Sequence, residues 1–219
     1  MIQMKPLVKV DRVSSVEEAV QLQKLGVDII GISLDTDSRF RDCKCVTLDI
    51  AREIRDALEG SFLCCELKST NLLITLTNNC NLDFVQCPNW IVLESEFTEN
   101  LKKKNISLVY SNIQADRDDD PGWIIYPLPE EGSIINTIYQ VNLLTDIYDS
   151  WNFLKYECSK YKEFIQIAEI NNLAYEHLII FSIDFDRLNI LEILNAFPKI
   201  YGINFTLGEE TTRIHNDFH

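Results

Sequence analysis

The fold of this chain is decided by residues 9–31. Lys9-Val10-Asp11-Arg12-Val13-Ser14 comes first, a helical segment follows over residues 16–25, and Gly26-Val27-Asp28-Ile29-Ile30-Gly31 comes next. A short apolar run therefore lies on either side of a helix within about thirty residues, which is the repeating strand–helix–strand unit of parallel α/β folds. We predict that this unit opens a parallel sheet.

The same alternation continues along the chain. Apolar runs occur at residues 7–10, 27–34, 62–67, 84–87, 106–110, 139–144, 178–183 and 200–206, and the clearest further helical segments are 47–58, 164–175 and 187–197. Strands rich in Ile, Val and Leu, with little alternation, are typical of a parallel sheet that is buried on both faces. Eight such strands in 219 residues favour a single-domain (β/α)8 barrel over residues 1–219. Counting strands does not by itself exclude an open sheet.

One segment departs from this repetition. Residues 112–135 are expected to form an irregular insertion after the fifth strand, because an acidic turn is followed by a short extended piece. A solvated surface loop is the simpler interpretation. The functional interpretation is a protein-binding surface in which a tryptophan lies beside carboxylates. Its candidate residues are Asp116, Asp118, Asp119, Asp120 and Trp123.

Composition limits the function classes. The net charge is −14, which repels nucleic acid and anionic membranes. Solubility is the simpler interpretation of this charge, and the functional interpretation is a basic protein as partner. No apolar run approaches the roughly 18 residues of a membrane helix. Because the chain leads directly into its first strand, we expect a cytoplasmic protein with seven reduced cysteines. With three histidines, two of them in the last five residues, we expect no metal site and no cofactor.

Several stretches resemble, in order, those of the phosphoribosylanthranilate isomerase family, (β/α)8-barrel enzymes of tryptophan synthesis. Residues 9–14 are similar to the family's Lys-Ile-Cys-Gly-Ile-Thr, and residues 26–31 to its Gly-Ala-Asp-x-Ile-Gly. Residues 82–86 resemble Leu-Asp-x-Val-Gln, and residues 202–211 resemble the closing strand and loop. Residues 90–180 align poorly. The resemblance implies a barrel and an internal redox rearrangement of an aminoaldose to an aminoketose.

The resemblance also implies which residues would do the chemistry. Asp11 stands where the family has its cysteine base, and Arg12 replaces a glycine. A carboxylate can serve as a general base, and the simpler alternative is an Asp11–Arg12 pair at the barrel rim. Asp146 is the candidate general acid at the end of the sixth strand, with Asp149 as a further candidate. Asp149 or Ser150 is alternatively the N-cap of a helix over residues 151–161.

The phosphate site of the family is altered. Its Gly-Gly after the seventh strand is replaced by Ser182-Ile183-Asp184, and an aspartate at this point repels phosphate. If a phosphate site survives, its expected ligand-binding residues are Arg39, Gln86, Ser182, Thr206 and Gly208.

These observations leave three hypotheses. The first is a non-catalytic, isomerase-like barrel that binds a basic protein, as an immunity or antitoxin protein that neutralises a basic toxin does. The alternative is a divergent phosphoribosylanthranilate isomerase or related sugar isomerase that uses carboxylates, with Asp11 as base and Asp146 or Asp184 as partner. The third is a structural subunit of a larger enzyme. We expect no isomerase activity on phosphoribosylanthranilate itself.

Overall fold

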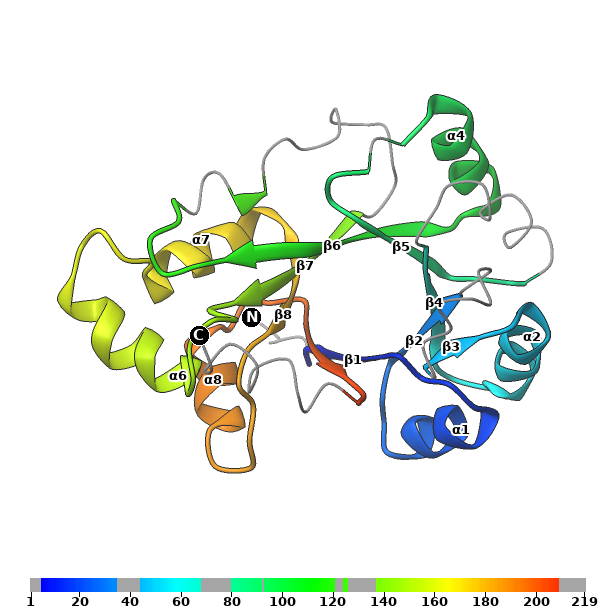
Figure 1. The fold of residues 1–219 in the computed structure, drawn as a ribbon, viewed down its shortest axis with the longest axis horizontal. Helices are drawn as coiled ribbons and strands as arrows, with labels where there is room; N and C mark the ends of the chain where they lie inside the picture. The colour runs from blue at the N-terminus through cyan, green and yellow to red at the C-terminus, as the bar shows by residue number, and fades with distance from the viewer. Residues whose placement is uncertain are drawn as a thin grey trace.

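A closed barrel of parallel strands forms the centre of the protein (Figure 1). The computed structural model describes residues 5–34, 44–67, 80–91, 93–120, 124–125 and 137–208. Around the ring, the strands are β1 (Leu7–Asp11), β2 (Ile29–Leu34), β4 (Phe62–Glu66), β5 (Phe84–Pro88), β6 (Ser107–Ala115), β7 (Thr137–Leu143), β8 (Leu178–Ser182) and β9 (Gly202–Thr206). Pairing of β1 with both β9 and β2 closes the ring. Because the ring is closed, the predicted (β/α)8 barrel is confirmed and the open-sheet alternative is ruled out.

A short ninth strand, β3 (Cys45–Val46), pairs with the end of β2 and lies outside the ring order. The predicted strand ranges agree with the observed ones to within a few residues, except in β6. That strand continues to Ala115 through a register shift between Tyr110 and Ile113, where Asn112 has a φ of 58°. The expected insertion at residue 112 is therefore wrong at its start, because residues 112–115 belong to the barrel. Residues 121–123 and 126–136, with Trp123, lie outside the described residues.

Helices cover the outside of the barrel (Figure 1). They are α1 (Val16–Lys24), α2 (Leu48–Ala57), α4 (Ser95–Lys104), α6 (Ser150–Asn152), α7 (Ile167–Glu176) and α8 (Ile190–Ala196). Local sequence explains where two of them begin: the side chains of Ser15 and Thr47 accept hydrogen bonds from the Glu18 and Ile50 amides. The apolar faces of the helices and the outward-facing strand residues form one continuous core.

The predicted helix over residues 151–161 is short and irregular. After α6 the chain continues as a π-helical turn, Phe153–Glu157, and a 3₁₀ turn, Cys158–Lys160. Asp149 occupies the N-cap position, but its side chain bonds none of the helix amides; it accepts a hydrogen bond from the Asn152 side chain at 2.7 Å. Asp149 is therefore at the predicted N-cap position, but its side chain does not form the expected capping hydrogen bond.

The inside of the barrel changes character along its axis. A separate apolar cluster fills its amino-terminal half and comprises Ile29, Cys64, Phe84, Val109, Ile138 and Ile180. The residues that follow on alternate positions toward the strands' carboxyl ends are polar, beginning with Lys9, which is fully buried. Bulky branched residues commonly fill such an interior through several layers. Here the polar upper layers leave space for a cavity.

Within the described ranges, the six cysteines form no disulfide. Burial raises the pKa of the Cys64 and Cys87 thiols to about 12, so both stay protonated at neutral pH. Cys43 lies outside these ranges. Among the described residues, no helix has the length and apolarity to cross a membrane.

Candidate functional site

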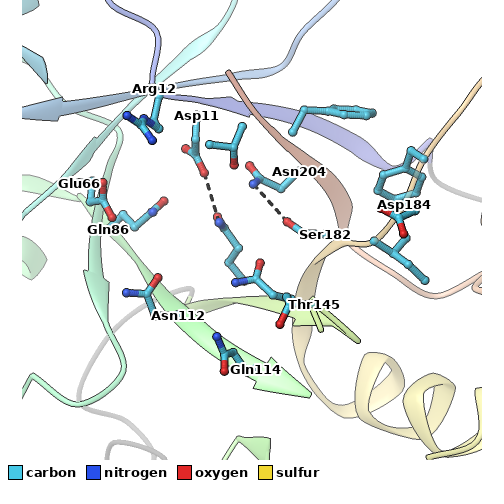
Figure 2. Close-up of a pocket in the computed structure, with 16 residues that line it drawn as sticks. Asp11, Arg12, Glu66, Gln86, Asn112, Gln114, Thr145, Ser182, Asp184 and Asn204 are labelled. Atoms are coloured by element: carbon cyan, nitrogen blue, oxygen red, sulfur yellow. Dashed lines mark hydrogen bonds between the residues drawn. The ribbon is translucent and has the colours of Figure 1, made fainter. Parts of the chain in front are cut away.

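A cavity of about 530 Å³ opens at the carboxyl ends of the barrel strands. Figure 2 shows its side chains converging from opposite sides of the ring. The lining residues are Asp11, Arg12, Glu66, Gln86, Asn112, Gln114, Gln140, Asn142, Thr145, Ser182, Ile183, Asp184, Phe185, Asn204, Phe205 and Thr206. This is the end of the barrel where (β/α)8 enzymes carry their active sites, and the volume lies in the range of small-molecule pockets.

Lys9 is fully buried beneath the floor of this cavity, under Asp11. Its ammonium pairs with Asp11 Oδ1 and donates to Gln86 Oε1 at 2.7 Å and Gln140 Oε1 at 2.8 Å, with Asn204 Oδ1 at 3.5 Å. A buried charge is tolerated when it is paired and hydrogen-bonded, as it is here. One lysine therefore joins strands from four positions around the ring.

The lysine also sets the orientation of the amides around it. An ammonium donates but cannot accept, so the carbonyl oxygens of these amides face it and their NH₂ groups face away. Gln140 Nε2 donates to Asp11 Oδ2 at 3.2 Å, and Asn204 Nδ2 donates to Ser182 Oγ at 3.3 Å. Both oxygens of Asp11 are thus engaged, yet a carboxylate has further lone pairs, and Asp11 borders the cavity (Figure 2).

Strand β2 lies between two carboxylates, Asp11 on β1 and Glu66 on β4, and helps to position both. Ser33 Oγ donates to Glu66 Oε2 at 2.5 Å. The Asp11 side chain packs directly on Gly31, where any Cβ would overlap Asp11 Oδ1 and lie 3.1 Å from its Cα. The glycine is therefore required by this close approach. Asp11 and Glu66 are held in the cavity by their neighbours on the strand between them.

Gly31→Ala is expected to lower the free energy of unfolding by about 1–3 kcal/mol, because overpacking displaces Asp11 from Lys9. Denaturant titration followed by circular dichroism measures this. Gly60→Ala is the matched control, since no atom lies within 4 Å of a Cβ at Gly60, and its effect should stay within about 0.5 kcal/mol. Equal effects of the two substitutions would contradict the close packing at Gly31.

The loop after β8 carries the third carboxylate of the cavity. Asp184 Oδ2 accepts hydrogen bonds from the Ser150 amide at 3.0 Å and the Ser150 hydroxyl at 2.9 Å. Ser150 is fully buried at the start of α6. The Asp184 carboxylate therefore already accepts the hydrogen bond from the Ser150 amide at the start of this helix.

Arg12 supplies a positive charge at the mouth, near Asp11 and Glu66 (Figure 2). Its φ is 65°, a left-handed conformation that glycine adopts more easily. The resemblance implied a glycine at this position, and the backbone conformation explains why. Gly208 also has a left-handed φ, of 79°. A Cβ there would lie 3.4 Å from Lys44 Cε, so a lysine side chain already packs over this glycine.

Several residues predicted from the sequence meet in the cavity, and others do not. Asp11, Gln86, Ser182 and Thr206 all line it. Asp146 is exposed and is not among the lining residues, so its predicted role as the acid of this site is not supported by its position. Gly208 follows β9 outside the lining, and Arg39 lies outside the described residues.

The residues of the acidic turn are not among those that line the cavity. Asp118, Asp119 and Asp120 are exposed and Asp116 is half-buried. Burial, together with the charges of Asp146 and Asp119, raises the pKa of Asp116. The turn thus gathers negative charge at the rim without contributing to the cavity lining.

Sequence reasoning missed Lys9, Glu66, Gln140 and Asn204. Their signal was a polar residue at every second position of otherwise apolar strands, as in Lys9 and Asp11 of β1. Such alternation indicates that one face of each strand lines a polar interior. Among the residues that the structure describes, no group of three His, Cys, Asp or Glu is placed to hold a metal ion.

Among known proteins, the chain matches solved structures but no sequence family. No protein-family model and no curated protein sequence matches the chain. Phosphoribosylanthranilate isomerase from Thermus thermophilus superposes with a TM-score of 0.59 at 16% identity, over 94% of this chain and 90% of that one. The isomerase from Thermotoga maritima superposes with a TM-score of 0.64 at 12% identity, over 94% and 90%.

This chain has the phosphoribosylanthranilate isomerase fold. A third isomerase structure, solved with reduced 1-(o-carboxyphenylamino)-1-deoxyribulose 5-phosphate, gives a TM-score of 0.64 at 11% identity, over 94% and 90%. The fold that the sequence resemblance implied is confirmed. Within this phosphoribosylanthranilate isomerase fold, Asp11 ends the first barrel strand and Asp184 follows the seventh, the positions expected for the base and for the altered phosphate loop.

Proposed function

We propose that the protein is an aldose–ketose isomerase that works through carboxylates, with Asp11 as its base. The observation that carries this proposal is an open cavity at the catalytic end of the barrel, with Asp11 held at its floor by Lys9 and Gln140. A mouth filled by Arg12 and large side chains would have favoured a non-catalytic barrel. The likeness in fold to phosphoribosylanthranilate isomerases supports the same class of reaction.

The proposed reaction is balanced without a co-reactant. Asp11 removes the proton from C2 of an open-chain aldose, and an enediolate forms. A proton is returned to C1, while Glu66 carries the hydroxyl proton from O2 to O1. Glu66 takes the part first expected of Asp146, because Glu66 borders the cavity and Asp146 does not. The donors on Gln86 and Gln140 stabilise charge that develops on the oxygens.

Proton exchange at C2 tests this function. The purified protein is incubated with a panel of aldoses in deuterated water, and the products are followed by proton NMR. We expect ketose to form and deuterium to enter at C1 or C2, above the rate in buffer alone, for at least one sugar. A sugar that binds the cavity with no exchange and no ketose would contradict the proposal.

The other sequence-based functions stay predictions. Binding of a basic protein or toxin rests on the net charge and the acidic turn. The cavity and the fold support a sugar isomerase better than an immunity or antitoxin role. A cytoplasmic location is likewise a prediction from the sequence.

A further inference from the structure

The loop after the seventh barrel strand uses its own amide hydrogens. Barrel enzymes frequently hold phosphate with amides of the loops after their last two strands. Here the Asp184 amide donates to Ser150 Oγ at 3.2 Å, and the Asp186 amide to Asn189 Oδ1 at 2.8 Å. The Leu188 and Asn189 amides both donate to Asp186 Oδ1 at 2.7 Å. Four amides of this loop are therefore already satisfied within the chain.

A carboxylate also stands where an incoming anion would be received. Asp184 accepts two hydrogen bonds from Ser150, at the start of α6, and borders the cavity (Figure 2). A phosphate placed there would face this negative charge at close range. It would also have to displace a carboxylate from its two donors.

The charge of the described lining acts in the same direction. Among the residues that the structure describes, three carboxylates, Asp11, Glu66 and Asp184, face the cavity with one guanidinium, that of Arg12. Lys9 lies beneath the floor and is already paired with Asp11. The cavity is therefore less favourable to an anion than to an uncharged ligand.

The rest of the lining suits hydroxyl groups. Within the described part of the chain, six carboxamides border the cavity: Gln86, Asn112, Gln114, Gln140, Asn142 and Asn204. Each carboxamide both donates and accepts, as does a sugar hydroxyl. Phe185 and Phe205 lie with ring centroids 5.3 Å apart and also border the cavity, so they offer an apolar surface to the C–H face of a sugar ring.

We propose that this cavity takes an unphosphorylated, uncharged sugar, and that Asp184 on Ser150 excludes sugar phosphates. The proposal rests on the proposed isomerase function, because it names the substrate class of the same site. Carboxamides bind the hydroxyls, the two phenylalanines receive the ring, and Asp184 fills the place of the phosphate.

Matched pairs of sugars test the proposal by binding alone. Ribose with ribose 5-phosphate, and glucose with glucose 6-phosphate, are titrated into the full chain by ligand-observed NMR. In each pair that binds, we expect the unphosphorylated sugar to bind at least about tenfold more tightly. Asp184→Asn keeps an oxygen acceptor for Ser150 but removes the charge, and should reduce that preference about tenfold. Asp56→Asn makes the same change at an exposed aspartate of α2, outside the cavity lining, and should leave the preference unchanged.

The outcomes separate this proposal from the function on which it rests. A wild-type preference for the phosphorylated member, or no binding of any unphosphorylated sugar at 10 mM (about the weakest useful affinity), overturns the substrate class. Equal effects of Asp184→Asn and Asp56→Asn overturn the role of Asp184. Binding of the unphosphorylated sugar without proton exchange supports the substrate class and contradicts the isomerase. Turnover of the phosphorylated member alone contradicts the substrate class and supports the isomerase.

Discussion

Replacement of Lys9 by methionine is expected to lower the free energy of unfolding by about 3–5 kcal/mol. The substitution leaves the Asp11 carboxylate, whose side chain is only 12% exposed, without the counter-charge of Lys9. It also removes the donor shared by the oxygens of Gln86 and Gln140. Because a domain of this kind is stable by about 5–15 kcal/mol, the loss is a large part of the total. Urea denaturation followed by tryptophan fluorescence and circular dichroism measures it.

Two further variants isolate the cause of this loss. In Lys9→Met/Asp11→Asn the unpaired charge is gone, so the double variant should be more stable than Lys9→Met alone. Lys199→Met makes the same change at an exposed lysine and should alter stability by less than about 0.5 kcal/mol. A double variant no more stable than Lys9→Met would show that the charge of Asp11 is not what Lys9 balances.

The second large effect is expected on activity. Asp11→Asn should slow proton exchange at C2 by about 10²–10⁴-fold, the range for loss of a general base. The substitution keeps the size of the side chain and an oxygen that can face Lys9, so sugar binding should change little. The rate of deuterium incorporation and the dissociation constant, both measured by NMR, separate the two.

A matched change at another aspartate serves as the control for Asp11. Asp56→Asn changes an exposed aspartate of α2 outside the cavity lining, and its exchange rate should equal that of the unchanged protein. An exchange rate in Asp11→Asn within a few-fold of the unchanged protein would show that another group removes the proton. Glu66, the other carboxylate beside β2, would then be tested in the same way.

Local sequence was sufficient for the order and type of most elements. Apolar runs such as residues 84–87 and capping residues such as Ser15 act on their immediate neighbours, and they indicate strands and helix starts without knowledge of the rest. β6 was the exception. Its continuation to Ala115 depends on pairing with β7, which begins more than twenty residues later, and on the bulge near Asn112.

Asp146 shows what strand ends alone leave open. It lies in the expected loop after the sixth barrel strand, but it is exposed and is not among the residues that line the cavity. The residue that takes its place in the proposed mechanism, Glu66, is distant in sequence and is held by Ser33 from the neighbouring strand.

The amino-acid sequence by itself determined a parallel barrel, the place of Asp11 at the end of its first strand, and an aspartate in the loop where a phosphate would be held. Periodicity and residue types over short distances indicated the parallel strands and their helices, whereas the significance of Asp11 and of the loop aspartate was implied by the resemblance to the isomerase family. Only the tertiary structure decided that Lys9 lies beneath Asp11, that Gly31 makes room for it, and that Asp184 is seated on Ser150. Lys9 also contacts Asn204, 195 positions further along the chain, and closing the ring is what brings such distant residues together.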